Sequence, residues 1–321
     1  MSQLDFSTPK VVALGGGHGL AATLSALRQI THQITAIVTV ADNGGSSGRL
    51  RDEFEILPPG DLRMALTALC SDDDWGRSWA EILQYRFTSE GHLDQHTVGN
   101  LLLTALWDRD GDFVAGLDRV GSLLRVVGRV LPMAATPLDI EGTFQTTVGR
   151  IVVRGQKEVA TAKGRLESIR IIPENPQARP ESLRAISDAD YITMGPGSWL
   201  TSVLPHLMVP AQRDALSSTK AKKILLMNLD AHPSAGGDEF AGYTPEEHLT
   251  LLNDYAPSLR FNYVIADRSG IRDEKNLEAM VEGFGGELIL ADLRRAPGAI
   301  HHDVAKFSSQ FRHIFDRNGV E

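Results

Sequence analysis

Short apolar runs rich in β-branched residues alternate along the chain with segments whose apolar residues recur at helical spacing. Residues 11–14 form the first run, and the leucines at 20, 24 and 27 fall on one face of a helix. Residues 34–41 form the second run, which completes a strand, helix and strand unit. Further apolar runs follow at 191–194, 222–229, 261–267 and 287–292. The pattern predicts a three-layer α/β fold with a Rossmann-like, largely parallel sheet.

The middle of the chain has a different pattern. Runs at 143–148, 150–154 and 158–161 are short, β-type and separated by glycine. We expect them to form antiparallel ribbons inserted in the main sheet. A proline-bounded connector at 173–180 then leads back to helical sequence. We therefore interpret residues 1–321 as a single α/β domain with a β-rich insertion at about 130–172.

A glycine turn follows the first predicted strand, and it contains the strongest candidate binding residues. Glycine allows positive φ angles and close approach of the backbone to a ligand, and the N-terminus of the following helix attracts anions. The alternative is a tight turn that only packs a helix on the sheet. Leu20 stands where the dinucleotide fingerprint needs glycine, and the Gly-Lys-Ser/Thr of a Walker motif is absent. The candidate residues are Gly15, Gly16, Gly17, His18, Gly19 and Leu20.

A second polar loop follows the second predicted strand, and its residues are Asp42, Asn43, Gly44, Gly45 and Ser46. Asp42 can ligate a divalent cation or accept a hydrogen bond from a sugar hydroxyl, and the glycines and Ser46 can donate to phosphate oxygens. The alternative is an Asx turn that caps a helix beginning near Arg49. Asp61 follows Pro-Pro-Gly, and helix capping alone would explain it.

Three further places carry polar groups near predicted helix starts or strand ends. Asn100 begins a helical stretch, where a ligand contact and a core-anchoring role are equally well supported. Asn228 lies near the carboxyl end of a predicted strand, where ligands bind in open α/β sheets. A second strand-to-helix glycine turn comprises Gly195, Pro196, Gly197 and Ser198, with a purely structural turn as the alternative.

Other polar clusters are weaker candidates. The loop at 230–243 is long enough to be a lid or binding loop, although a plain insertion is equally consistent with it. His301, His302 and Asp303 are adjacent, and adjacent helical side chains diverge, so a helix cap is favoured over a metal site. Cys70 lies in an apolar helical pattern and is expected to be buried.

Composition narrows the class of protein. The formal net charge of -9 disfavours a general nucleic-acid-binding role. A single cysteine excludes an intramolecular disulfide and fits a reducing compartment. The polar start of the chain reaches a strand without a signal peptide, and no apolar run approaches transmembrane length. We expect a cytoplasmic protein.

The motifs together resemble the YvcK, or gluconeogenesis factor, family, which shares the fold of the phospholactate transferase CofD. The resemblance covers nearly the whole chain, and His18, where many relatives carry threonine, resembles the actinobacterial branch. It implies a cytoplasmic protein that binds UDP-sugars such as UDP-N-acetylglucosamine and is needed for cell shape and envelope synthesis on gluconeogenic carbon sources. It leaves open Mg²⁺ as a cofactor, protein partners in envelope synthesis and a homo-oligomeric state. The motifs are Gly-Gly-Gly-His-Gly-Leu at 15–20, Val-Ala-Asp-Asn-Gly-Gly-Ser-Ser-Gly-Arg-Leu-Arg at 40–51, Leu-Pro-Pro-Gly-Asp at 57–61, Val-Gly-Asn at 98–100 and Gly-Pro-Gly-Ser at 195–198.

Two functions are consistent with these motifs. In the favoured one, a regulator, the loops at 15–20 and 195–198 hold a diphosphate, the loop at 42–46 meets phosphate or sugar, and Asn100 and Asn228 fix the orientation. In the other, a CofD-like transferase, Asp42 holds Mg²⁺ and Asp61 supports the acceptor.

Asn43 departs from the aspartate common in the family loop, which weakens the case for metal-assisted transfer. An NAD(P)-dependent oxidoreductase is disfavoured by Leu20. Replacing Gly17 by valine is expected to abolish ligand binding and leave the fold largely intact.

Overall fold

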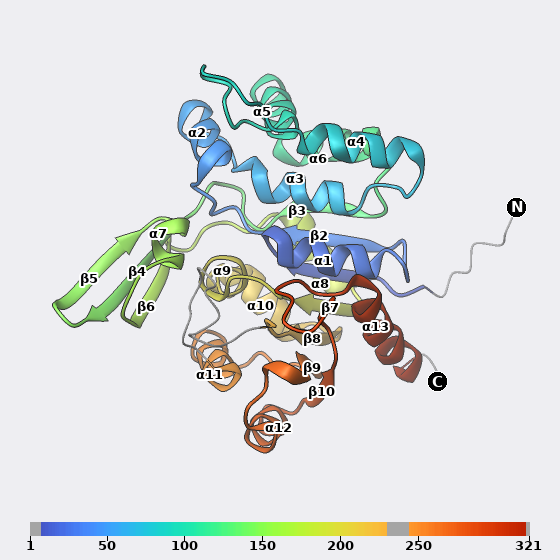
Figure 1. Cartoon of the computed structure of the whole chain (residues 1–321), viewed down its shortest axis with the longest axis vertical. Coiled ribbons are helices and arrows are strands. Elements are labelled where there is room, and N and C mark those ends of the chain that lie inside the picture. Colours follow the sequence, from blue (N-terminus) through green and yellow to red (C-terminus); the bar gives the residue numbers. More distant parts are fainter. Residues whose placement is uncertain (1–7, 230–243, 319–321) are drawn as a thin grey trace, which may run out of the picture.

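The computed structural model describes residues 8–229 and 244–318. In those residues the main sheet has seven strands, and all neighbouring strands in it run parallel (Figure 1). From edge to edge the strands are β10 (Glu287–Ala291), β9 (Tyr263–Asp267), β8 (Lys222–Leu226), β7 (Tyr191–Met194), β1 (Val11–Gly15), β2 (Ile34–Val38) and β3 (Arg129–Pro132).

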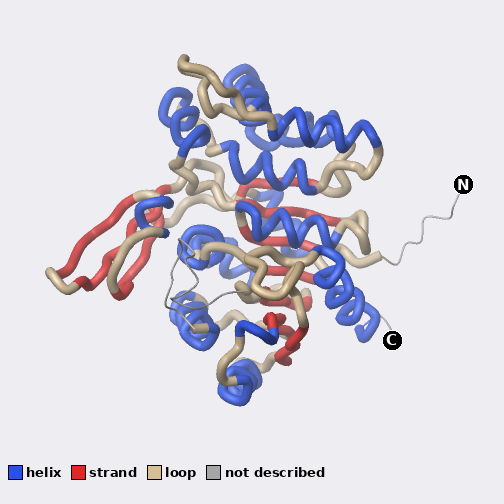
Figure 2. The backbone as a smooth tube through the Cα atoms, in the orientation of Figure 1, coloured by secondary structure: helices blue, strands red, loops and turns tan. Residues whose placement is uncertain are grey.

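The strand order reverses direction between β1 and β7. The chain runs outward from β1 to β2 and β3, then crosses back to β7 and runs the other way to β10. Helices cover both faces of the sheet, as Figure 2 shows, and this gives the three-layer α/β fold that the sequence predicts. Open sheets of this kind bind ligands beyond the carboxyl ends of the strands at such a switch point.

The central strand and its helix follow directly from the hydrophobic pattern. Val11, Val12, Ala13 and Leu14 of β1 are all buried, because β1 has a parallel neighbour on each side and helices on each face. α1 (Gly17–Leu27) buries the predicted leucine face. The other helices are α2 (Gly45–Phe54), α3 (Pro59–Ala68), α4 (Asp74–Gln84), α5 (Val98–Asp110), α6 (Phe113–Leu124), α7 (Gln156–Ala160), α8 (Pro180–Asp188), α9 (Pro205–Met208), α10 (Pro210–Ser218), α11 (Pro245–Tyr255), α12 (Glu274–Gly283) and α13 (Val304–Asn318), with a π-helix η1 (Trp199–Val203) and a 3₁₀ turn η2 (Arg268–Gly270).

A separate three-stranded antiparallel sheet projects from the body of the molecule, visible in green in Figure 1. We call it the projecting sheet; its order is β5 (Gly149–Arg154), β4 (Asp139–Thr146) and β6 (Arg165–Ile172). The prediction that these ribbons are inserted in the main sheet is therefore wrong. The run at 158–161 lies largely in α7 instead of a strand, because so short an apolar run does not distinguish helix from strand.

Two predicted helix starts also need correction. α2 begins at Gly45, four residues before Arg49. Asp61 does not cap α3, because Pro58 occupies the N-cap position and Pro59 the first helical position, which places Asp61 within the first turn. Across the two described stretches, no helix is both long and apolar enough to cross a lipid bilayer.

Candidate functional site

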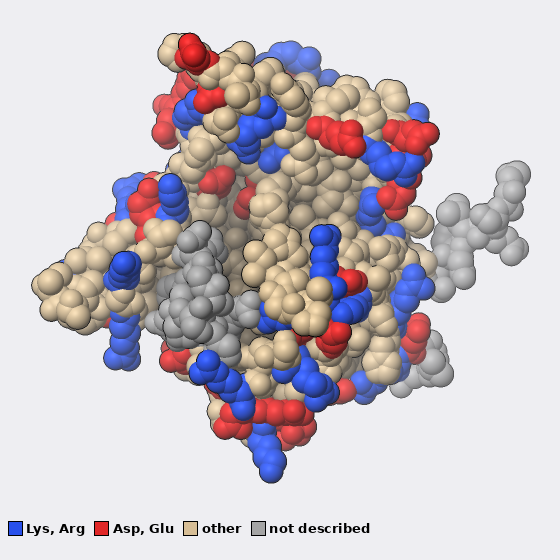
Figure 3. Space-filling model, viewed as in Figure 1, with Lys and Arg blue, Asp and Glu red and all other residues tan. Residues whose placement is uncertain are grey.

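The loops after β1 and β7 pack against each other at the switch point of the sheet. A Cβ atom on Gly19 would lie 2.1 Å from the carbonyl oxygen of Pro196, so only glycine permits this approach. A Cβ on Gly197 would in turn lie 3.8 Å from the carbonyl oxygen of Gly16. In the space-filling view of Figure 3 the molecule is hollowed near its centre, and acidic atoms lie inside the hollow. The two glycine turns predicted from sequence therefore form one continuous surface.

The glycine turn, residues 15–19, opens α1 with free backbone donors. Gly16 is the N-cap, and Gly17 has a left-handed φ of 57°. The first intrahelical bond runs from the Leu20 N–H to the Gly16 carbonyl oxygen at 3.3 Å. The N–H groups of His18 and Gly19 precede that bond and so have no acceptor within the helix. The exposed His18 stands beside them, and the turn can therefore receive an anion.

Asp61 faces this turn as a partly buried carboxylate. Burial and the neighbouring Asp42 raise its pKa to about 7, although the Thr39 hydroxyl donates to it at 3.4 Å and the Gly17 N–H also bonds to it. Its Oδ2 would lie 2.6 Å from a Cβ on Gly16, so the carboxylate contacts the backbone of the turn. Asp61 therefore lies against the glycine turn, a position compatible with the acceptor-supporting role considered from sequence, and it does not act as the N-cap of α3.

Asp42 forms the Asx turn that the sequence allows and also lies near Asp61. Its Oδ1 accepts a hydrogen bond from the Gly44 N–H at 2.9 Å. Burial raises its pKa, while the Gly44 N–H, the Ser47 hydroxyl and the charge of Arg51 oppose that rise. Two carboxylates with raised pKa values side by side favour a bound proton or a cation.

A magnesium ion carried by a diphosphate fits these two carboxylates. Mg²⁺ is commonly bound by one or two carboxylates together with substrate phosphates and water. Within residues 8–229 and 244–318 no group of three or more His, Cys, Asp or Glu side chains is placed to hold a metal ion.

The Asn43 side chain does not face Asp61. It joins the loop to α7, which lies between β5 and β6 of the projecting sheet in the chain. Its Oδ1 accepts a hydrogen bond from the Gln156 N–H at 2.9 Å, and its Nδ2 donates to Glu158 at 3.3 Å. Both contacts lie at the start of α7. Gly44 and Gly45 remain at the open end of α2, where Gly45 has a φ of 49° and a Cβ placed on it would meet no atom within 4 Å.

Ser46 and Asn100 belong to a buried hydrogen-bond chain behind the second loop. Asn100 Nδ2 donates to Ser46 Oγ at 3.0 Å, and Ser46 Oγ pairs with His96 Nδ1 at 2.9 Å. Asn100 Oδ1 accepts from Arg63 Nε at 3.0 Å. Thr97 caps α5 as its position suggests. In this structure Asn100 anchors α5 to α2.

Asn228 fixes the second glycine turn. Its Oδ1 accepts from the Gly197 N–H and its Nδ2 donates to the Gly197 carbonyl oxygen, both at 3.0 Å. The Gly197 N–H is therefore already used within the protein. Ser198 precedes the short π-helix η1, where the sequence suggests an ordinary helix start.

Three side chains at the glycine turn were not among the candidates from sequence. Thr39 and Ser202 place hydroxyl oxygens 2.5 Å and 3.2 Å from a Cβ built on Gly16. His206, fully buried, has its Nε2 3.3 Å from the Gly15 carbonyl oxygen. Only Thr39, at the end of the second apolar run, could have been found from position alone.

The weaker candidates lie elsewhere. Cys70 is buried and its pKa is raised to about 11, so it is not a reactive thiolate. Asp303 Oδ1 accepts hydrogen bonds from the N–H groups of Ala305 and Lys306, which confirms a helix cap. The loop at 230–243 lies outside the described residues.

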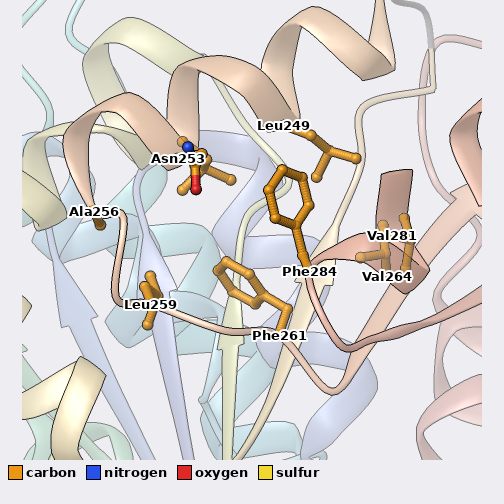
Figure 4. A pocket seen from close by; sticks show the side chains of 9 residues that line it. Leu249, Asn253, Ala256, Leu259, Phe261, Val264, Val281 and Phe284 are labelled. Atoms are coloured by element: carbon orange, nitrogen blue, oxygen red, sulfur yellow. The ribbon is translucent and has the colours of Figure 1, made fainter. Parts of the chain in front are cut away.

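An apolar pocket beside α11 and α12, lined by side chains such as Phe261 and Phe284, offers no charged group to a diphosphate (Figure 4).

Known proteins resemble this chain over most of its length. The family model described as 2-phospho-L-lactate transferase CofD matches residues 11–294. A Mycobacterium tuberculosis protein named "Putative gluconeogenesis factor" is 45% identical over 309 residues, which cover 94% of this chain and 89% of that protein. The "Gluconeogenesis factor" of Bacillus subtilis is 36% identical over 266 residues, which cover 83% and 81%.

A solved structure supports the same relationship. The crystal structure of a UPF0052 family protein from Bacillus halodurans aligns with a TM-score of 0.83 at 31% identity, covering 96% of this chain and 99% of that one. Sequence and fold thus agree over the main sheet and the loops of the crevice. The chain belongs to the CofD family, on the branch that contains the gluconeogenesis factors.

Proposed function

We propose that this protein is a gluconeogenesis factor that binds a UDP-sugar, with Mg²⁺ on the diphosphate, at the switch point between β1 and β7. The observation that supports the proposal is the partly buried pair Asp42 and Asp61, whose pKa values are both raised, next to the open N-terminus of α1. The helix end attracts the diphosphate and the carboxylates attract its cation. The names of the relatives support a role in growth on gluconeogenic carbon sources.

Each loop has a part in this proposal. The N–H groups of His18 and Gly19 donate to phosphate oxygens, and Asp42 and Asp61 hold the metal. Asn228 and Asn100 act indirectly, because their amides hold the turn at 195–198 and the start of α2 in place. When bound, Mg²⁺ would neutralise charge on the diphosphate.

Calorimetry of the purified protein with UDP-N-acetylglucosamine tests the proposal. We expect binding in the micromolar to millimolar range with Mg²⁺ and at least tenfold weaker binding with EDTA. Asp61→Asn should lose most of the Mg²⁺ dependence, whereas Asp292→Asn, a change to an exposed aspartate far along the chain, should bind like the wild type. The absence of binding heat with UDP-sugars under all of these conditions would refute the proposal.

Gly17→Val is a less clean test than the sequence suggests. Gly17 has a φ of 57°, and a β-branched residue is strained in that conformation whatever the surrounding space. Loss of binding in that variant would therefore combine blocked access with a distorted turn. Asp61→Asn keeps the backbone and changes only the charge.

A CofD-like transferase is the second candidate, and the pKa of Asp61 favours it. A partly buried carboxyl that titrates near neutrality can take a proton from an acceptor hydroxyl. Incubation with Mg²⁺, a nucleotide-linked phospholactate and a deazaflavin acceptor tests this activity. Product formation that is lost in Asp61→Asn would support transfer; no turnover alongside a working authentic transferase would exclude this reaction.

A growth experiment tests the cellular role. A strain that lacks the protein should grow on glucose with normal shape and fail or round up on gluconeogenic carbon sources. The wild-type protein should restore growth, and a variant that cannot bind the UDP-sugar should not. Restoration by a non-binding variant would separate the cellular role from ligand binding.

A further inference from the structure

Arg63 is a buried cation whose bonded partners are both neutral. It lies on α3 and is 5% exposed. Its Nε donates to Asn100 Oδ1 at 3.0 Å, and its Nη1 donates to Gln84 Oε1 at 2.6 Å. Among the described residues, no Asp or Glu carboxylate oxygen lies within 4.0 Å of a guanidinium nitrogen of Arg63, so it forms no ion pair. Burial and the nearby Arg86 lower its pKa to about 10, while the charge of Asp61 opposes that fall, and the group stays charged at neutral pH.

Such a charge is expensive to bury without an anion. A buried ion is normally paired or hydrogen-bonded to an opposite charge. Arg294, which is similarly buried at 6%, has the carboxylate of Asp267 at 3.2 Å. For Arg63, the carboxyl end of α4 at Gln84 offsets part of the charge through its dipole, and the charge of Asp61 offsets a further part, but no carboxylate of the described residues forms an ion pair with the guanidinium.

One side of the Arg63 guanidinium borders open space. Its Nη2 makes no hydrogen bond within the described part of the chain, yet it is not among the fully enclosed polar atoms that lack a partner. The nitrogen therefore reaches solvent although the residue is 95% covered, since its exposed fraction is 5%.

The open side of Arg63 is separate from the glycine turn. Residues two apart on a helix point about 200° apart, so Asp61 and Arg63 leave α3 in different directions. Asp61 contacts Gly16 and Gly17, whereas the Arg63 side chain lies across Gly99, where a Cβ would be 2.7 Å from its Cδ. The two charged side chains therefore contact different parts of the protein, Asp61 the glycine turn and Arg63 the start of α5.

We propose that Arg63 forms an anion-binding subsite, distinct from the glycine turn, for the carboxylate or phosphate group of a second ligand. The guanidinium fork suits either group, because its N–H donors match two oxygens of one oxyanion. Arg86 increases the attraction from outside. The inference goes beyond the proposed nucleotide ligand and does not depend on it.

Inorganic phosphate is the probe for the first experiment, with thermal unfolding followed at constant ionic strength as phosphate replaces chloride. Phosphate should raise the melting temperature of the wild type through preferential binding to the folded state. Gln84→Glu puts a carboxylate where a neutral oxygen already contacts Arg63, and should weaken phosphate binding about tenfold or more without loss of stability. Gln33→Glu adds the same charge at an exposed position away from Arg63 and should leave phosphate binding unchanged.

Arg63→Gln provides an independent variant, which should also lose the phosphate effect. Equal phosphate affinity in the wild type and in Gln84→Glu would overturn the subsite, as would the absence of any phosphate effect in the wild type. A parallel titration with acetate compares the carboxylate with the phosphate as the bound group.

A second arm repeats the phosphate titration with saturating UDP-N-acetylglucosamine. Persistence of the Gln84-dependent phosphate effect supports a second ligand, and its disappearance would show that the nucleotide ligand fills the subsite and would overturn the separate site. If the UDP-sugar does not bind, the proposed function fails but the comparison of wild type and Gln84→Glu still decides the subsite.

Discussion

Asp267, buried at the carboxyl end of β9, and Asp61, partly buried in the first turn of α3, have pKa values shifted in opposite directions. Burial alone would raise the pKa of Asp267, but the Ser269 hydroxyl, the Leu293 N–H at 2.7 Å and the Arg294 guanidinium hold it below its usual value. Loss of hydration and the neighbouring charge of Asp42 raise the pKa of Asp61 to about 7, although the Thr39 hydroxyl, the Gly17 N–H and the charge of Arg63 oppose that rise. We infer that Asp267, whose charge is balanced within the protein, has a structural role. The charge of Asp61 is not fully balanced within the protein and is available to a ligand.

The largest effect on stability is expected when the ion pair between Asp267 and Arg294 is removed. Asp267→Ala removes the carboxylate partner of the buried Arg294 and should lower the free energy of unfolding by about 3–5 kcal/mol. Urea denaturation measures it. Asp292→Ala removes an exposed partner of Lys306 and should cost under about 1 kcal/mol. Similar losses in both variants would mean that Asp267 has no special structural role.

A gain in stability, instead of a loss, is expected when the charge of Asp61 is removed. Because the folded-state pKa of Asp61 is raised, its contribution to stability is full below about pH 4 and is lost as pH rises through about 7. Without Mg²⁺, Asp61→Asn should therefore be more stable than the wild type at pH 8, by about 2–4 kcal/mol. The gain should vanish at pH 4 in the same urea titrations. A variant less stable than the wild type at pH 8 would contradict the uncompensated charge.

The smallest effect is expected from a new carboxylate at position 43, whose side chain faces the start of α7. Asn43→Asp keeps the acceptor for the Gln156 N–H but replaces the donor to Glu158 by a like charge. Because both groups are exposed, we expect a loss of about 0.5–1 kcal/mol in urea denaturation. The double variant Asn43→Asp with Glu158→Gln should recover it. Failure of the second change to restore stability would rule out repulsion as the cause.

The sequence predicted the parts of the fold that depend on local pattern. The apolar run at Val11–Gly15 and the glycines after it were sufficient to place β1, the start of α1 and a candidate anion site. The parallel order followed from alternating strands and helices. The projecting sheet was placed wrongly, because strand pairing depends on partners distant in sequence and a short run carries no information about them.

The candidate site was predictable in outline and not in its chemistry. Asp42 stands at the end of an apolar run, a position that marks ligand loops, so its place could be inferred. The role of Asp61 depends on the approach of Gly16 and Asp42 from other elements, and capping was the simpler interpretation of its local sequence. The pairing of Asn228 with Gly197 likewise joins two loops that no local spacing connects. The roles of these residues toward a ligand stay predictions.

The pairing of β1 with β7 has a consequence for synthesis on the ribosome. β1 begins at Val11 but its partner begins at Tyr191, whereas β2 and β3 lie earlier in the chain. Until residues 191–194 emerge, β1 is the exposed edge of a partial sheet, a hydrophobic edge that invites pairing with other chains. Docking of the later strands both covers that edge and brings the turn at 195–198 against Gly19. The nascent chain therefore brings the two glycine turns together in the same step that covers this exposed edge.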